Sequence, residues 1–114
     1  MKLEGEQVLL RIFVDSFRRY RHRPLYEAIV EHARRRGYAG ATVFEGIEGF
    51  GMSGIFLKEK RWALANDREM VIELVDTPQR LDALLEELEP MLEDVVVTRE
   101  RAKVVRYLGH GRRS

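Results

Sequence analysis

The sequence predicts one α+β domain in which two helices cover one face of a mostly antiparallel four-stranded sheet. Stretches of alternating apolar and polar residues predict the strands, and two stretches with apolar residues three and four positions apart predict the helices. The elements follow as strand, helix, strand, strand, helix, strand, which is the βαββαβ order of the split βαβ, or ferredoxin-like, arrangement. We expect this single domain to span residues 1–108, followed by a disordered basic tail over residues 109–114.

The composition indicates a globular protein with a balanced surface charge. Hydrophobic residues make up 45% of the 114 residues and charged residues 34%, yet the formal net charge is only +1. A general nucleic-acid binder carries a strong basic excess, so we expect no nucleic-acid partner. The chain has no cysteine, which excludes disulfides and thiolate chemistry. Neither a signal peptide nor a long apolar run is visible, so we expect no membrane insertion and a cytoplasmic location.

The first strand is predicted over residues 8–15, where apolar residues alternate with more polar ones. Residues 16–23 follow as a polar connector whose core reads FRRYRHR. This mixture of bases and aromatics is compatible with RNA binding on a ferredoxin-like domain. The aromatic-rich strand motif of that RNA-binding class is absent, and the other interpretation is a solvated connector that enters a helix.

The first helix is predicted over residues 24–36. Pro24 suits the first turn of a helix, because its missing N–H would be unpaired there. Gly37 is the expected left-handed residue after the helix, and arginines fill the last turn, where cations complement the helix dipole. The apolar stripe consists of Leu25, Ala28, Ile29 and Ala33.

The second strand, residues 41–47, leads into a glycine-rich stretch. Four of the nine glycines fall between Gly46 and Gly54. Glycine weakens a strand and helps where the backbone must turn unusually or where something must approach closely. We therefore expect a ligand site or a mobile loop here. The alternative is a bulge and a tight turn that only shape the backbone.

The second half of the chain repeats the strand and helix signals. Residues 70–75 alternate as a third strand, and Thr77 followed by Pro78 predicts the start of a helix. This helix carries a leucine stripe and should end near Glu89, because Pro90 cannot continue it. Residues 95–98 predict a fourth strand, and residues 102–107 are either a fifth strand or its continuation.

Both helices on one face leave the other face of the sheet uncovered. An uncovered apolar sheet face needs a partner, and a closed cyclic oligomer is the usual solution. We expect the following apolar side chains on that face: Leu9, Phe13, Val71 and Val75.

Four segments, in order, resemble the family known as domain of unknown function 190. They are PLYEAIV at 24–30, GATV at 40–43, GIEGFG at 46–51 and VIELVD at 71–76. The resemblance extends over residues 3–107, and this family is similar to the PII-like (GlnB-like) superfamily. It implies a homotrimer whose sheets line a central space, and a regulatory signalling protein that binds an adenine nucleotide (AMP, ADP or ATP) or a related small ligand in clefts between subunits. Residues 51–66 would form a mobile loop that contacts a target, either a membrane transporter or an enzyme.

The resemblance also suggests ligand-binding residues. Backbone N–H groups at the glycines can approach a phosphate or sugar, and the aromatic ring among them can stack on adenine or fill a subunit interface. The cations of the following loop and of the chain's end can bind phosphates. The candidates are Gly46, Gly49, Phe50, Gly51, Lys58, Arg61 and Arg106. PII proteins carry a second glycine-rich phosphate loop before the last strand, whereas residues 91–94 here read MLED.

A reaction is not visible in the sequence. Glu45 and Glu48 are compatible with an acid–base pair, but no histidine is near them in the sequence, and the three histidines lack metal-ligand spacing. We expect neither catalytic residues, nor a metal, nor a covalent cofactor. Two alternatives stay open: a small enzyme that acts on a nucleotide-like ligand in the same cleft, and a purely structural trimeric adaptor.

Overall fold

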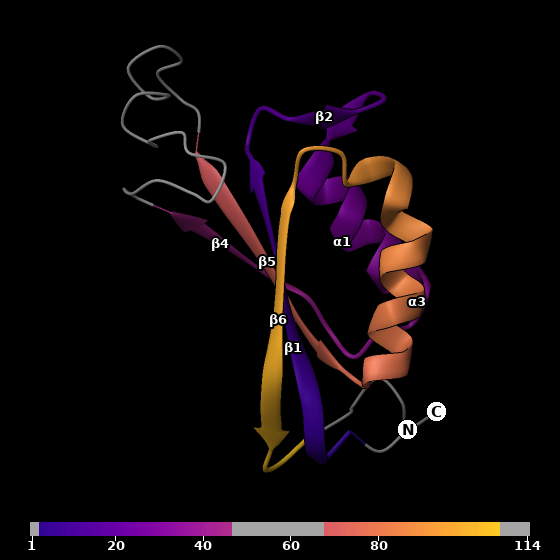
Figure 1. Cartoon of the computed structure of the whole chain (residues 1–114). Helices are drawn as coiled ribbons and strands as arrows, with labels where there is room; N and C mark the ends of the chain where they lie inside the picture. The colour runs from indigo at the N-terminus through magenta and orange to yellow at the C-terminus, as the bar shows by residue number, and fades with distance from the viewer. Residues whose placement is uncertain (1–2, 47–67, 108–114) are drawn as a thin grey trace.

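The computed structural model describes residues 3–46 and 68–107, so the predicted loop at 51–66 and the tail at 109–114 lie outside the described residues. Within them, one four-stranded sheet carries two helices on a single face (Figure 1). The strand order is β4-β5-β1-β6, and all three pairings are antiparallel, which is the predicted ferredoxin-like arrangement. The main elements are β1 Gly5–Asp15, α1 Leu25–Arg35, β4 Thr42–Gly46, β5 Glu69–Asp76, α3 Pro78–Leu88 and β6 Val96–Val104.

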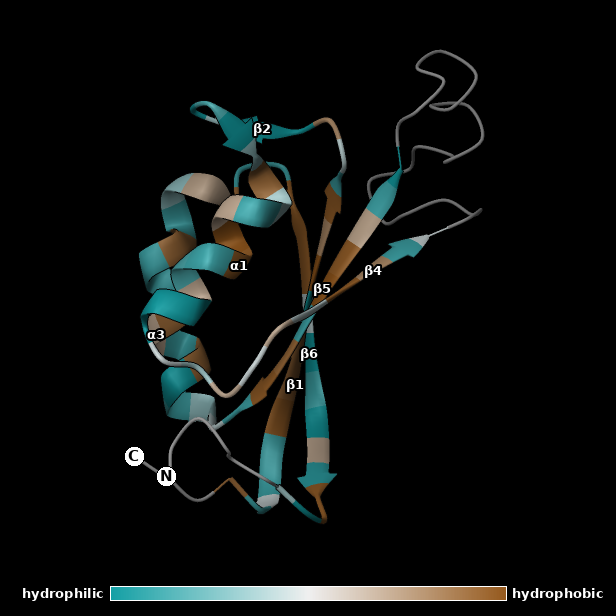
Figure 2. Cartoon of the chain, turned by 180° about the vertical axis from the view of Figure 1, so that it is seen from behind, coloured by the Kyte–Doolittle hydropathy of each residue, from teal (hydrophilic) through white to brown (hydrophobic). Residues whose placement is uncertain are grey.

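The core lies between the sheet and the two helices. Alternation along β1 and β5 points every second side chain toward the helices, and Leu10, Ile12 and Ile72 are completely buried there. The helices contribute the stripes that the sequence predicts, including Ile29 and Leu84. Figure 2 shows hydrophobic residues along the central strands and hydrophilic ones along the outer surfaces of the helices.

The helix ends follow local sequence rules with one exception. Thr77 caps α3, because its hydroxyl accepts a hydrogen bond from the Arg80 backbone N–H at 3.2 Å. Pro90 lies in a short 3₁₀ helix, η1 Glu89–Met91, that ends α3 as predicted. The exception is Pro24, which precedes the helix as its N-cap instead of occupying the first turn. Its ψ of 138° is extended, so that α1 begins at Leu25.

The connector before α1 is more ordered than the sequence indicates. It forms a small hairpin of β2 Arg19–Tyr20 and β3 Arg23–Pro24. The Leu25 N–H donates to the Arg18 carbonyl at 2.7 Å, so Arg18 belongs to the base of this hairpin. Arg21 turns the chain between them with a left-handed φ of 61°. Pro24 pairs with Arg19 in this hairpin, which explains why it adopts a strand conformation.

The last strand is continuous. β6 runs without a break through the charged residues 99–101. The sequence pattern did not decide whether these residues continue one strand or separate two strands. Its pairing with β1 extends from Phe13–Val96 to Gly5–Val104, and this tertiary pairing overrides the weak local signal. Charged residues also suit an edge strand, because they discourage pairing with other chains.

The face opposite the helices is uncovered within the described chain. Leu9, Phe13, Val71 and Val75 are partly buried and alternate with fully buried residues, so they lie on this face as predicted. In register, an apolar row crosses all four strands as Phe44, Val71, Phe13 and Val96. Phe44 is 50% exposed.

Candidate functional site

Gly46 is the last described residue of β4, and its backbone is that of an ordinary strand. It pairs in register with Glu69, and its φ lies outside the left-handed region. A Cβ added there would lie 3.4 Å from the Glu69 Cβ, which is normal van der Waals contact. Neither a bulge nor a turn therefore requires glycine at this position. Because glycine has no side chain, Gly46 leaves the backbone of β4 accessible on the uncovered face, two residues after Phe44.

The strand ends around Gly46 are held together by a short network. The Arg68 backbone N–H donates to the Ser16 hydroxyl at 2.9 Å, and the Ser16 backbone N–H donates to the Arg68 carbonyl at 2.7 Å. The Arg68 guanidinium in turn forms an ion pair with Glu45. The ends of β1 and β4 and the start of β5 thus form one fixed edge, from which residues 47–67 depart.

Five of the candidate ligand residues lie outside the described residues: Gly49, Phe50, Gly51, Lys58 and Arg61. The other two, Gly46 and Arg106, lie at opposite ends of the sheet. Arg106 is exposed just after β6, where the neighbouring Tyr107 N–H donates to Glu4 at 3.1 Å. At about 3.4 Å per residue along β1, roughly 34 Å separate the two ends. One chain does not bring Gly46 and Arg106 to the same ligand.

The connector before β6 lies at the same end of the sheet as Gly46. It turns without glycine, because Asp94 takes the left-handed conformation at φ 59°. The Val95 N–H donates to the Leu92 carbonyl at 3.2 Å. The Arg18 guanidinium donates to the Glu93 carbonyl, a contact between the β2–β3 hairpin and this connector for which the sequence carries no signal.

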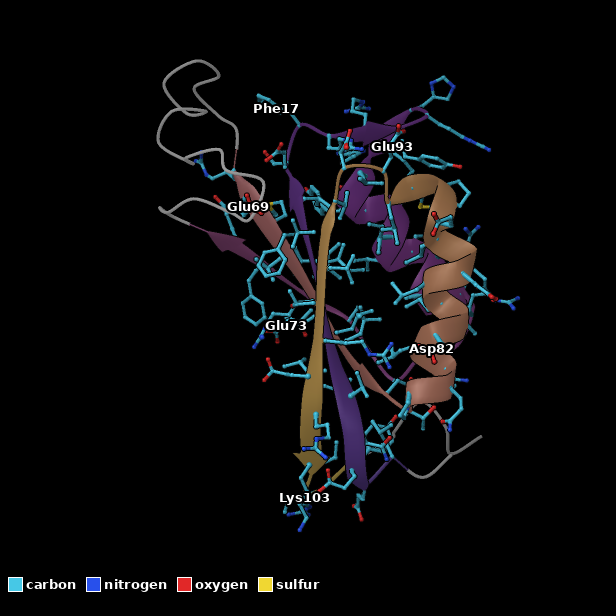
Figure 3. The ribbon with its side chains drawn as sticks, in the orientation of Figure 1. Phe17, Glu69, Glu73, Asp82, Glu93 and Lys103 are labelled. Carbon is cyan, nitrogen blue, oxygen red and sulfur yellow. The ribbon has the colours of Figure 1, made fainter. Side chains whose placement is uncertain are left out.

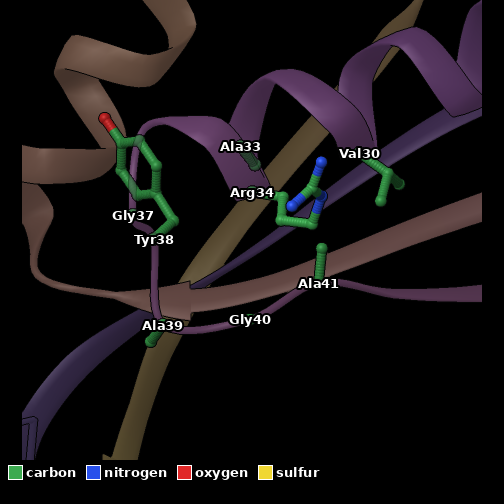
Figure 4. A pocket seen from close by; sticks show the side chains of 8 residues that line it. All are labelled: Val30, Ala33, Arg34, Gly37, Tyr38, Ala39, Gly40 and Ala41. Atoms are coloured by element: carbon green, nitrogen blue, oxygen red, sulfur yellow. The ribbon is translucent and has the colours of Figure 1, made fainter. Parts of the chain in front are cut away.

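At the other end, residues 37–41 separate two cavities. One, of about 420 Å³, lies between α1 and this segment and is lined by Val30, Arg34 and Tyr38 among others (Figure 4). The other, of about 430 Å³, lies toward Glu73 and Tyr107. Neither cavity is lined by Gly46 or Arg106. The sequence did not predict either cavity, although Gly37 and Gly40 lie in the segment between them.

The buried carboxylate of Asp76 holds the segment between the two cavities. It is 1% exposed and accepts hydrogen bonds from the Ala39 N–H at 3.1 Å and from the Arg80 Nε at 2.9 Å. Arg80 also donates to the Gly37 carbonyl at 2.8 Å and stacks over the Tyr38 ring. Burial raises the pKa of the Tyr38 hydroxyl, and Glu87 adds to this shift. These groups satisfy one another, which indicates a structural role.

The uncovered face also carries a charged row beside the apolar one. Arg11 lies between Glu73, at 2.7 Å, and Glu100, at 3.1 Å. The hydrogen bond with Glu73 raises the pKa of Arg11. The face therefore combines an apolar row with a fixed, paired charge row, a pattern that suits a specific protein contact.

The described part of the chain shows no constellation for metal binding. Residues 3–46 and 68–107 contain no group of three or more side chains that could hold a metal ion. Glu45 is engaged by Arg68, and Ser16 is engaged by the Arg68 backbone. Over the same residues, no helix is long and apolar enough to cross a membrane.

Comparison with known sequences identifies relatives over most of the chain. The family model DUF190, described as "Uncharacterized ACR, COG1993", matches residues 7–104. A UPF0166 protein of Aquifex aeolicus is 35% identical over 80 residues, which cover 70% of this chain and 76% of that protein. A UPF0166 protein of Methanocaldococcus jannaschii is 28% identical over 80 residues, with 70% and 73% covered.

Comparison with solved structures gives matches to PII-like proteins. CPII bound to ADP and bicarbonate, from Thiomonas intermedia K12, superposes with a TM-score of 0.63 at 21% identity, covering 89% of this chain and 90% of that one. CPII bound to ADP, AMP and acetate, from the same organism, gives 0.64 at 20% identity, with 93% and 94% covered. A protein classed as PII-like and signaling, from Thermus thermophilus, gives 0.58 at 20% identity, with 95% and 100% covered. The chain therefore belongs to the DUF190 family and has a PII-like, ferredoxin-like fold.

Proposed function

We propose that this protein is a non-enzymatic, PII-like regulatory protein that binds an adenine nucleotide or a related small ligand. The observation that carries the proposal is the fold shared with CPII, whose structures hold ADP in one case and both ADP and AMP in another. The bare strand end at Gly46 supports it, because neither strain nor crowding explains that glycine. AMP, ADP and ATP are the candidate effectors.

We propose a homotrimer with the ligand in the clefts between its subunits. The uncovered apolar row needs a partner, and a second copy of the chain supplies one. A shared cleft also accounts for the separation of Gly46 from Arg106, since residues from opposite ends of two chains can meet at a subunit boundary. The other proposed ligand residues are those of the segment that follows Gly46, namely Gly49, Phe50, Gly51, Lys58 and Arg61.

The segment between β4 and β5 is the proposed contact with a regulated target. The contacts among Ser16, Arg68 and Glu45 hold the strand ends on both sides of this segment together. A ligand bound at Gly46 would therefore change the segment and not the strands that flank it. We propose that binding changes the conformation of residues 51–66 and thereby alters contact with a membrane transporter or an enzyme.

Isothermal titration calorimetry with AMP, ADP, ATP and cyclic AMP tests the proposal. The protein should bind at least one of them, with a stoichiometry of one ligand per chain, and light scattering should give the mass of a trimer. A folded oligomer that binds none of the four nucleotides would overturn the nucleotide assignment. Release of phosphate or consumption of the bound nucleotide would overturn the non-enzymatic assignment.

A further inference from the structure

The β2–β3 hairpin concentrates arginines that no described carboxylate neutralises. Most arginines elsewhere in the described chain form ion pairs: Arg11, Arg34, Arg35, Arg36, Arg68, Arg80 and Arg99. Within residues 3–46 and 68–107, by contrast, Arg18, Arg19 and Arg21 have no carboxylate within ion-pair distance. The hairpin therefore presents net positive charge in a small area.

The hairpin holds these guanidinium groups in place through backbone acceptors and a ring. Arg19 donates to the His22 carbonyl at 2.6 Å, and Arg18 donates to the Glu93 carbonyl. Arg21 lies over the Tyr20 ring, 5.1 Å from its centroid. These contacts use only part of the donor capacity of each guanidinium and leave its charge uncompensated, which favours an anion with several oxygens.

The hairpin lies at the end of the sheet where Gly46 lies. Figure 3 shows three labelled residues at this end: Phe17, which precedes the hairpin, Glu69, which pairs with Gly46, and Glu93, in the connector before β6. The Ser16–Arg68 hydrogen bonds join the hairpin's entry to the edge that carries Gly46. The connector itself offers exposed acids at Glu93 and Asp94 and no glycine, so it is a poor phosphate loop. Arg68 also lies at this end, but Glu45 neutralises it, so among the described residues the positive charge without a carboxylate partner at this end belongs to the hairpin.

We infer that Arg18, Arg19 and Arg21 bind the phosphate chain of the nucleotide, an inference that rests on the proposed function. The phosphates are the part of the ligand that carries charge and multiple acceptor oxygens. Affinity should therefore rise from adenosine through AMP and ADP to ATP. It should weaken with added salt, because Arg19 and Arg21 are exposed to solvent.

The experiment titrates adenosine, AMP, ADP and ATP into the full chain and into Arg19→Gln and Arg21→Gln variants, at low and high salt. Glutamine at position 21 is as strained by the left-handed backbone as arginine is, so that variant changes mainly the charge. Each variant should lose about tenfold in affinity for ATP, less for ADP and AMP, and none for adenosine. Arg35→Gln, on the exposed side of α1, is the matched control and should bind all four ligands normally.

The outcomes separate the two proposals. If the parent chain binds no nucleotide, the proposed function fails and this inference fails with it. If the parent binds ATP and the hairpin variants bind it equally tightly, or lose adenosine as much as ATP, only the inference about the arginines is wrong. If a short single-stranded RNA occupies the hairpin and no nucleotide displaces it, the phosphates recognised are those of a polynucleotide, and the inference is also wrong. Circular dichroism and light scattering confirm that each variant is folded and assembled.

Discussion

The surroundings of Gly46 distinguish between two reasons for a glycine, which are a structural requirement of the backbone and the close approach of a ligand. Its neighbours leave room for a methyl group, and its backbone conformation is one that any amino acid can adopt. A glycine kept for geometry usually shows a left-handed φ or a crowded Cβ position, as Gly37 does with φ +79°. Position 46 shows neither, which favours the close approach of a ligand or of a second chain.

Replacement Gly46→Ala should leave the fold intact and impair binding. Alanine in a strand costs less backbone entropy than glycine, so the free energy of unfolding should be unchanged or higher by about 0.5–1 kcal/mol. Nucleotide affinity, measured by calorimetry, should fall. A loss of more than about 1 kcal/mol in urea unfolding would instead show that the backbone needs glycine here, as in the bulge interpretation.

Glu87 makes the stability of the chain depend on pH. Its carboxylate lies 2.7 Å from His32 and 3.1 Å from Arg36. The hydrogen bond with His32, followed by that with Arg36, lowers the pKa of Glu87 below its usual 4.5. A carboxylate whose pKa is lower in the folded chain stabilises the fold above the unfolded pKa, and this contribution disappears as the pH falls through the folded pKa.

In the variant Glu87→Gln, the free energy of unfolding should therefore fall less steeply as the pH is lowered into the acid range. Urea unfolding of the parent and the variant should differ most above the usual pKa of 4.5 and converge at lower pH. Glu86→Gln is the matched control, because Glu86 is exposed and forms no ion pair with any described residue. A constant difference between parent and Glu87→Gln across the whole acid range would contradict this assignment.

At the scale of elements, predictions held where a local rule decides the backbone and weakened where tertiary contacts decide it. The cap at Thr77, the end of α3 before Pro90 and the glycine after α1 each follow from one residue type with one conformation. The unbroken β6 depends instead on β1, a partner distant in sequence, and the β2–β3 hairpin pairs locally but is joined to a distant connector through Arg18. A run of arginines carries no signal for the Glu93 carbonyl that Arg18 binds.

The segment between α1 and β4 offers a test of such a local rule. Gly37 and Gly40 both have open space where a Cβ would lie, but only Gly37 has a left-handed φ. Gly37→Ala should cost about 1 kcal/mol of unfolding free energy from backbone strain alone, while Gly40→Ala should cost little or nothing. Equal losses, measured by thermal unfolding, would mean that the conformation at Gly37 is not what requires glycine.

At the scale of the whole molecule, the sheet has one face covered by helices and one face open. Its period-two pattern predicted both faces, because alternation fixes which residues share a side. The proposed ligand site is less predictable from sequence, since Gly46 and Arg106 lie at opposite ends of the sheet in one chain and the relation between copies is not encoded in local patterns. The hairpin arginines were visible only as a basic run, with no indication of which of them lacked carboxylate partners.

The open face should control assembly. Phe44 lies in the apolar row and is half exposed, so Phe44→Asp would place a charge in any contact made by that row without disturbing the core. The variant should elute and scatter as a monomer, whereas the parent should be a trimer. Gln79→Asp, at an exposed position of α3 on the other side of the sheet, is the control and should leave the parent mass unchanged. Retention of the parent mass by Phe44→Asp would exclude this row as the contact.

The central position of β1 has a consequence for how the chain folds. Both neighbours of this first strand come from the second half of the sequence, since it pairs with β5 and β6 along almost its whole length. Such pairings have a high contact order, and the entropy of closing long loops must be overcome before they form. During synthesis β1 leaves the ribosome first but stays unpaired until β5 and then β6 emerge. The four-stranded sheet therefore cannot be complete until β6 has been synthesised, and β1 lacks both of its strand partners until β5 has emerged.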